Sequence, residues 1–142
     1  MTSQAARPAS ADDARGDVFD PGCPTRRLLD RIGTKWTSMA VKVLAEAAPA
    51  EVRFSELLRR MPGVSQKMLS VTLRNLTRDG LVARRVEPTV PPQVHYRLTG
   101  LGLSLEAALA VVRTWAEEHM AEVDRANELS GRDEAPRPQV NS

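Results

Sequence analysis

Residues 53–98 read RFSELLRRMPGVSQKMLSVTLRNLTRDGLVARRVEPTVPPQVHYRL, and this stretch decides the fold. The pair Pro62-Gly63 is a sharp break between two segments whose apolar residues recur at helical spacing. Ser55 and Ser65 stand just before these segments, where a serine hydroxyl caps a helix N-terminus. The stretch therefore predicts two helices joined by a tight turn. In the second helix we expect the inward side chains to be Met68, Leu69, Val71, Leu73 and Leu76.

A β-hairpin is predicted directly after the second helix. That helix is expected to end at about Asp79, because Gly80 readily adopts the left-handed conformation that stops a helix. LVARRVEP (81–88) alternates weakly between apolar and polar residues, and VHYRLT (94–99) alternates clearly. PTVPP (88–92) lies between them and blocks regular pairing, so it forms the loop tip. Two helices, a tight turn and a hairpin are the layout of a winged helix-turn-helix.

The remainder of the chain adds mainly helices. Pro24 suits the first position of a helix that Gly33 ends, and a second helix is expected from about Lys35 to Ala47. A short extended piece is expected at Val52–Phe54. Apolar residues from Leu103 to Val123 trace a long amphipathic helix. The predicted fold class is mainly α with a small β-hairpin.

Composition divides the chain into a central domain and two tails. Residues 1–20 are rich in Ala, Ser, Pro and Asp and are expected to be a disordered arm. Residues 21–122 form the winged helix-turn-helix domain. Residues 123–142 are expected to be a tail, in which the last helix ends and disorder begins at about residue 126. No secretory leader or membrane-spanning run is recognised, so we expect a cytoplasmic protein.

The central domain is basic, although the net charge of the whole chain is only +2. Residues 23–120 hold 15 Lys and Arg against 9 Asp and Glu, and residues 53–97 hold 9 against 3. The acidic tails hide this surplus in the total. A compact basic domain favours a polyanionic partner such as nucleic acid.

The N-terminal part of the second helix is predicted to read bases in the major groove of double-stranded DNA. Its polar side chains suit that role, because Gln pairs with adenine, Lys donates to guanine and Ser accepts several partners. Two alternatives remain open: an ordinary solvated surface, or a winged-helix module that binds a protein. His95 is expected to be a strand-surface residue or a phosphate contact rather than a metal ligand. The predicted DNA contacts are Arg53, Ser65, Gln66, Lys67, Ser70, Arg74, Arg84, Arg85, Pro91, Pro92 and His95.

Enzyme chemistry finds no support in the sequence. No nucleophile–base pattern, phosphate-binding loop or dinucleotide-binding turn is present. One cysteine excludes an intramolecular disulfide and a Cys-rich zinc site, and neither histidine has metal-ligand spacing. We therefore expect no catalytic residues, no metal and no cofactor.

Several long stretches resemble HxlR-type transcriptional regulators, which are winged-helix relatives of the MarR group. They are CPTRRLLDRIGTKW (23–36), the run from residue 53 to 85, PPQVHYRLTGLG (91–102) and the pair Trp115-Ala116. The resemblance implies a homodimer with a wing and a recognition helix on each subunit, bound to a two-fold operator. The sequence departs from the family pattern at Thr34, Thr77 and His95, where a Gly, a Glu and a Glu are usual.

The final helix supports a dimer independently, because it is longer than a small domain needs for its own core. The open alternative is that its apolar face packs on the first helix of the same chain. The resemblance also places the first helix at the interface. The predicted interface residues are Leu28, Leu105, Leu109, Val112 and Trp115.

Cys23 is a candidate redox sensor. It precedes Pro24 at the start of the first helix, where the helix dipole and nearby Arg26 and Arg27 favour a thiolate. The resemblance implies the same, because several members sense oxidants, quinones or aldehydes at this position. An oxidant, a small electrophile or a thiol adduct would then act at Cys23. The open alternatives are a structural cysteine, and a regulator that responds to a non-covalent ligand.

Overall fold

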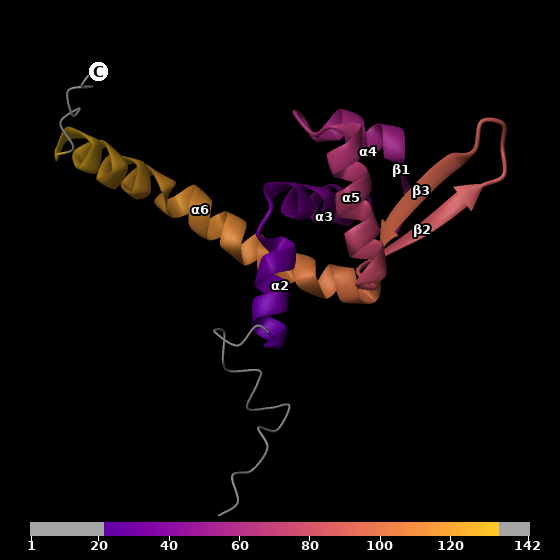
Figure 1. Cartoon of the computed structure of the whole chain (residues 1–142), viewed down its shortest axis with the longest axis horizontal. Coiled ribbons are helices and arrows are strands. Elements are labelled where there is room, and N and C mark those ends of the chain that lie inside the picture. Colours follow the sequence, from indigo (N-terminus) through magenta and orange to yellow (C-terminus); the bar gives the residue numbers. More distant parts are fainter. Residues whose placement is uncertain (1–21, 134–142) are drawn as a thin grey trace, which may run out of the picture. The chain divides into compact units, whose positions relative to one another are not determined.

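The computed structural model describes residues 22–133 of the chain, in two compact units that meet between Glu106 and Ala107. The predicted arm at residues 1–20 lies outside the described residues, as does the end of the C-terminal tail. Along the chain, the elements are α2 (Pro24–Ile32), α3 (Lys35–Ala47), β1 (Val52–Arg53), α4 (Phe54–Arg60), α5 (Gln66–Arg78), β2 (Val82–Glu87), β3 (Gln93–Leu98) and α6 (Gly100–Asp133) (Figure 1).

The helices of the first unit begin and end close to where local signals place them. Pro24 is the first residue of α2, and the hydroxyl of Thr34 accepts a hydrogen bond from the backbone N–H of Thr37 at the start of α3. Gly80 follows α5 with a φ of 75°, in the left-handed region that favours glycine. The predicted stop after α5 is therefore confirmed.

The prediction for Ser55 is wrong. Helix α4 begins at Phe54, two residues earlier than a cap at Ser55 requires, and its N-cap position is occupied by Arg53, whose side chain makes no capping bond. The cause is the sheet: β1 ends at Arg53, so the chain turns into the helix as soon as its pairing ends. Ser55 lies inside the first turn of α4 instead of before it.

Strands β2 and β3 form the predicted hairpin, which extends from the helices of its unit (Figure 1). The sheet has a third strand, because β1 pairs antiparallel with β3 through Val52 and Tyr96. The strand order is β1-β3-β2, so β3 is central. A central strand has a neighbour on both edges, and this position decides the environment of His95 described below.

The core of the first unit lies between α3, α4, α5 and the base of the sheet. Helix α3 packs on both α5 and β3, and α5 also packs on β2. The fully buried side chains are almost all aliphatic, as the low aromatic content requires. The largest are Leu44, Leu57, Met61, Leu69, Leu73, Leu76 and Val41.

A tight junction connects the end of α5 to the start of α6. The Thr99 hydroxyl donates to the Gly80 carbonyl at 2.7 Å and accepts from the Gly102 N–H at 3.1 Å. A Cβ on Gly102 would stand 2.1 Å from the Leu81 carbonyl oxygen, far inside contact distance. Only glycine allows the first turn of α6 to approach the backbone this closely.

Helix α6 is longer than the sequence predicts. It continues to Asp133, whereas disorder was expected from about residue 126. The segment from 126 to 130 reads ANELS, and Ala, Glu and Leu propagate a helix well once it is formed. The first proline after Gly100 is Pro136, so no proline interrupts α6 within the described residues.

Candidate nucleic-acid interface

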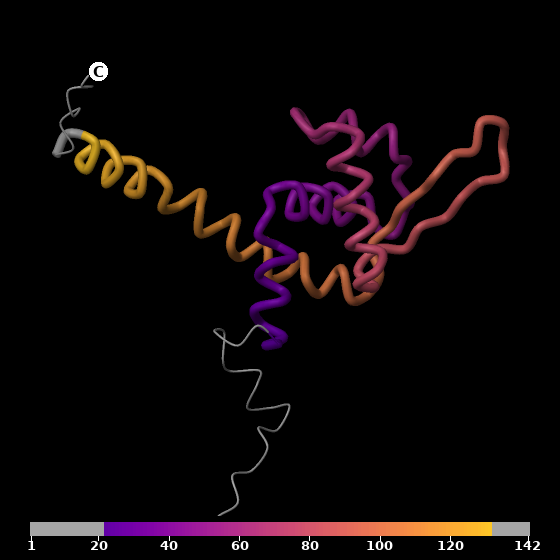
Figure 2. The backbone as a smooth tube through the Cα atoms, in the orientation of Figure 1, coloured from indigo at the N-terminus to yellow at the C-terminus, as the bar shows by residue number. Residues whose placement is uncertain are grey.

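Helices α4 and α5 form a helix-turn-helix, and the chain between them can be followed in Figure 2. The hydroxyl of Ser65 accepts a hydrogen bond from the backbone N–H of Met68 at 3.0 Å, so the predicted N-cap of α5 is confirmed. Leu69, Thr72, Leu73 and Leu76 anchor α5 on the core side. This spacing of three and four residues leaves the opposite face of α5 for solvent.

The outward face of α5 carries the polar residues that the sequence predicted. Gln66, Lys67 and Arg74 are exposed, and Ser70 is partly exposed. The prediction of which residues point inward is wrong at two positions, because Met68 is 41% exposed and Val71 is 37% exposed. The buried stripe of α5 continues from Leu69 to Thr72 one turn later. Met68 and Val71 lie outside this stripe.

Several basic side chains of this region are already engaged by carboxylates. Arg59 pairs with Glu56 in the same helix, Arg60 pairs with Glu46 at 2.5 Å, and Arg31 pairs with Asp79. Within residues 22–133, no carboxylate pairs with Lys67, Arg74 or Arg84. These three exposed cations are therefore available to phosphates or base edges.

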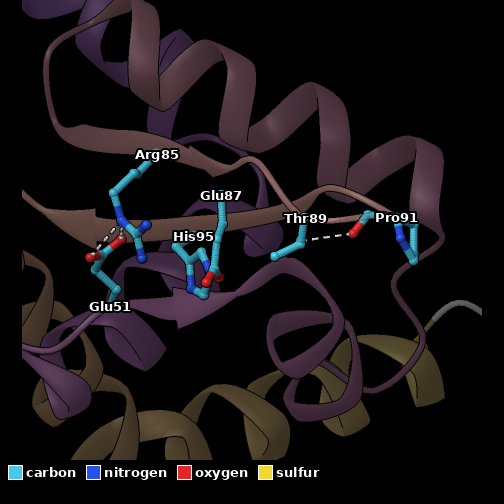
Figure 3. Close-up of polar contacts among 6 residues, drawn as sticks. All are labelled: Glu51, Arg85, Glu87, Thr89, Pro91 and His95. Carbon is cyan, nitrogen blue, oxygen red and sulfur yellow. Dashed lines mark hydrogen bonds and ion pairs between the residues drawn. The ribbon is translucent and has the colours of Figure 1, made fainter.

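Arg85 is less available than predicted. Its Nε lies 3.0 and 2.9 Å from the two carboxylate oxygens of Glu51, a residue that directly precedes β1 (Figure 3). Arg84 is the next residue along β2 and therefore lies on the other face of the sheet. The two arginines were predicted as equivalent DNA contacts, but only Arg84 is without a carboxylate partner in the described chain.

The interpretation of His95 as a strand-surface residue or phosphate contact is wrong. The residue is 8% exposed, and its Nε2 lies 2.9 Å from a carboxylate oxygen of Glu87 (Figure 3). His95 faces Arg53 on β1 and Arg85 on β2, because its strand is central. The hydrogen bond from His95, with the nearby cations, lowers the pKa of Glu87 below its ordinary value of 4.5.

The tip of the hairpin is held by short-range hydrogen bonds. The Thr89 hydroxyl donates to the Pro91 carbonyl at 2.9 Å (Figure 3). The Thr89 N–H donates to the Glu87 carbonyl at 2.8 Å. Pro91 and Pro92 are exposed, and neither has a backbone N–H to donate. The tip thus presents an apolar edge with restricted backbone freedom. Arg84 lies behind it on β2, and Arg53 lies on β1 on the other face of the sheet.

The helix-turn-helix and its hairpin also match a family by sequence. Residues 31–124 match the model of the HxlR-like helix-turn-helix family, which is more than half of the chain. The chain belongs to this family. It is a helix-turn-helix transcriptional regulator and not an enzyme.

Relatives of this HxlR-like protein span most of its length. The HTH-type transcriptional regulator YdeP of Bacillus subtilis is 36% identical over 113 residues, 80% of this chain and 85% of YdeP. The structure of the transcriptional regulator YtfH of Salmonella typhimurium superposes with a TM-score of 0.71 at 35% identity, covering 80% of this chain and 98% of YtfH. The structure of the redox regulator HypR in its reduced form superposes with a TM-score of 0.63 at 34% identity, covering 72% of this chain and 98% of HypR.

Cys23 of this HxlR-like protein is fully buried. It holds the N-cap position of α2, its carbonyl accepts from the Arg27 N–H at 3.1 Å, and its side chain makes no capping bond. Arg27 is exposed and Arg26 is partly exposed. Within residues 22–133, no group of three or more His, Cys, Asp or Glu is arranged to hold a metal ion.

The predicted interface residues differ in exposure. Leu28 is 43% exposed, and Val112 and Trp115 are 63% and 52% exposed, while Leu105 is partly exposed. Leu109 is only 6% exposed, so the chain itself already covers most of its side chain. The ring of His119 stacks on Trp115 with centroids 4.7 Å apart. Across residues 22–133, no helix has the length and apolar character needed to cross a membrane.

Proposed function

We propose that this regulator binds a two-fold DNA operator as a homodimer, with α5 of each subunit in the major groove. The observation that carries the proposal is the outward face of α5, where Lys67 and Arg74 are exposed and no described carboxylate pairs with either. The N-terminus of a helix also attracts phosphate through its unbonded N–H groups and its dipole. Gln66 and Ser70 supply hydrogen bonds for base edges beside these cations.

The wing would contact the duplex backbone next to the groove. Arg84 is exposed on β2, and Pro91 and Pro92 restrict the backbone of the tip. Arg53 is exposed at the end of β1, on the other face of the sheet. His95 is buried and hydrogen-bonded to Glu87, so its role in the wing is to join β3 to β2 and not to contact phosphate. In a symmetric dimer the two copies of α5 stand about 34 Å apart, one turn of duplex. We propose repression as the effect, because a dimer on both half-sites covers that stretch of duplex.

The double variant Lys67→Ala, Arg74→Ala tests this assignment. We expect it to lose sequence-specific binding in a gel-shift assay while its circular dichroism stays unchanged, because both side chains are exposed. Each lost phosphate contact should also reduce the slope of log K against log salt by about one unit.

The matched control is Lys42→Ala, Arg125→Ala, which removes the same charge from α3 and α6. It should bind like the wild type. Undiminished binding by the α5 variant would contradict the recognition-helix assignment. Binding by the wild type that does not weaken with salt would favour a protein-interaction module instead.

We further propose that oxidants or electrophiles release the regulator from DNA by modifying Cys23. Support comes from its position at the N-terminus of α2, one turn from Arg26 and Arg27, and from the likeness to a redox regulator. A buried thiol cannot accept an adduct without moving its surroundings, so modification would displace the start of α2. The same burial favours the alternative, in which Cys23 is structural and a non-covalent ligand releases DNA.

A further inference from the structure

The outward face of α5 contains two apolar side chains among its polar ones. Met68 and Val71 are 41% and 37% exposed, and they lie three residues apart, so they are neighbours on the helix surface. Val71 is also one turn from both Lys67 and Arg74. An apolar pair thus lies within the cationic surface assigned to the major groove.

A partner that covers this part of α5 must present an apolar group and a negative charge within a few ångströms of each other. A protein surface that covered Met68 and Val71 would also have to neutralise Lys67 and Arg74. The major groove of B-DNA offers both features at this scale, because thymine projects a 5-methyl group there between the phosphate strands. Cytosine, adenine and guanine present no methyl group in the groove.

We infer that Met68 and Val71 determine operator specificity by contacting thymine 5-methyl groups in the major groove. The inference rests on the proposed function and adds to it a base preference that the polar residues alone do not supply. Both residues lie within the first two turns of α5, the part of a recognition helix that reaches base edges. Neither is needed for the core, which is formed by Leu69, Leu73 and Leu76 on the opposite side.

Uracil isolates this contact, because it pairs like thymine but lacks the methyl group. A duplex is first selected by the wild-type protein from a random-sequence library, and each thymine is then replaced singly by uracil. At one or more thymines in each half-site, we expect the wild type to bind the uracil duplex about fourfold more weakly, as for one buried methyl group. The Met68→Ala, Val71→Ala variant should bind both duplexes equally.

Met120→Ala is the control, since Met120 is 42% exposed on α6, almost the same exposed fraction as Met68. It should keep the wild-type ratio of thymine to uracil affinity. Specific binding that no uracil substitution weakens would overturn the inference and leave the proposed function intact. A uracil effect that persists in the double variant would overturn it equally. If the wild type selects no sequence, the proposed function is wrong and the inference with it.

Discussion

A single side chain, the thiol of Cys23, decides whether this regulator senses its surroundings by covalent chemistry. The thiol is buried at the start of α2, with two arginines in the turn that follows. Because it is the only cysteine, oxidation could join it to the partner's cysteine or to a small thiol, but to no other residue of the chain.

The variant Cys23→Ser distinguishes a sensor role of Cys23 from a structural role, because serine keeps the size of the side chain and removes the thiol. We expect diamide to release wild-type protein from its operator and to leave the serine variant bound, in a gel-shift assay run with intact-mass measurement. A mass increase in the wild type should accompany release. If the serine variant releases DNA as well, the response does not pass through Cys23.

Helix caps and stops could be predicted from single residue types. The buried side of α5 could not, because it depends on which residues lie on the same face of the helix. The cap at Ser65 and the stop at Gly80 follow from residue type alone. The apolar character of Met68 and Val71 predicts that both side chains point inward, which is wrong. The residues three and four positions after Leu69 are Thr72 and Leu73, and both are buried. Helical spacing therefore predicts the buried face of α5 better than residue type does.

The sheet shows how a strand can be predicted while its pairing is not. Both hairpin strands follow from alternation and from the proline-rich tip, and the extended piece predicted at Val52–Phe54 corresponds to β1. With only two residues, β1 carries no signal for the strand with which it pairs. Its pairing with β3 makes that strand central, which is why His95 is buried and why Glu87 became its partner. Glu51 and Glu87 had no sequence signal as partners, because their contacts depend on strand register.

The Glu87–His95 contact predicts an acid-sensitive wing. The folded-state pKa of Glu87 is lowered, so its contribution to stability is fully present above about pH 4.5 and is lost as pH falls through the folded-state pKa. We expect Glu87→Gln to unfold at a lower urea concentration than the wild type at about pH 7. The two midpoints should approach each other as the pH falls below 4.5 and through the folded-state pKa of Glu87.

Circular dichroism of the helices provides the measurement at each pH. The control is Glu128→Gln, an exposed carboxylate of α6 that makes no hydrogen bond to another part of the described chain. It should leave the urea midpoint of the wild type unchanged at neutral pH. A Glu87 variant as stable as the wild type at neutral pH would show that the hydrogen bond contributes nothing to the wing.

At the scale of the whole molecule, the proposal requires a second copy of the chain. Val112 and Trp115 lie three residues apart on α6 and expose much of their apolar surface. Leu109, in line with them, is largely covered already, so it contributes little to a contact between subunits. We expect Val112→Asp to convert the protein from a dimer to a monomer of 15.6 kDa, measured by light scattering during size-exclusion chromatography.

Val111→Asp is the matched control, because Val111 is 69% exposed and points about 100° away around the helix. It should remain a dimer. A wild type that is monomeric, or a Val112 variant that stays dimeric, would contradict this interface. Monomers from both variants would place the contact on a different face of α6.

The junction at Gly102 has a mechanical consequence for such a dimer. The first turn of α6 is hydrogen-bonded through Thr99 to the chain that ends α5, at a distance too short for even one additional methyl group. The two helices therefore cannot rotate independently at this point. A change in the direction of the first turn of α6 would therefore also move the end of α5, the helix that we propose to read bases.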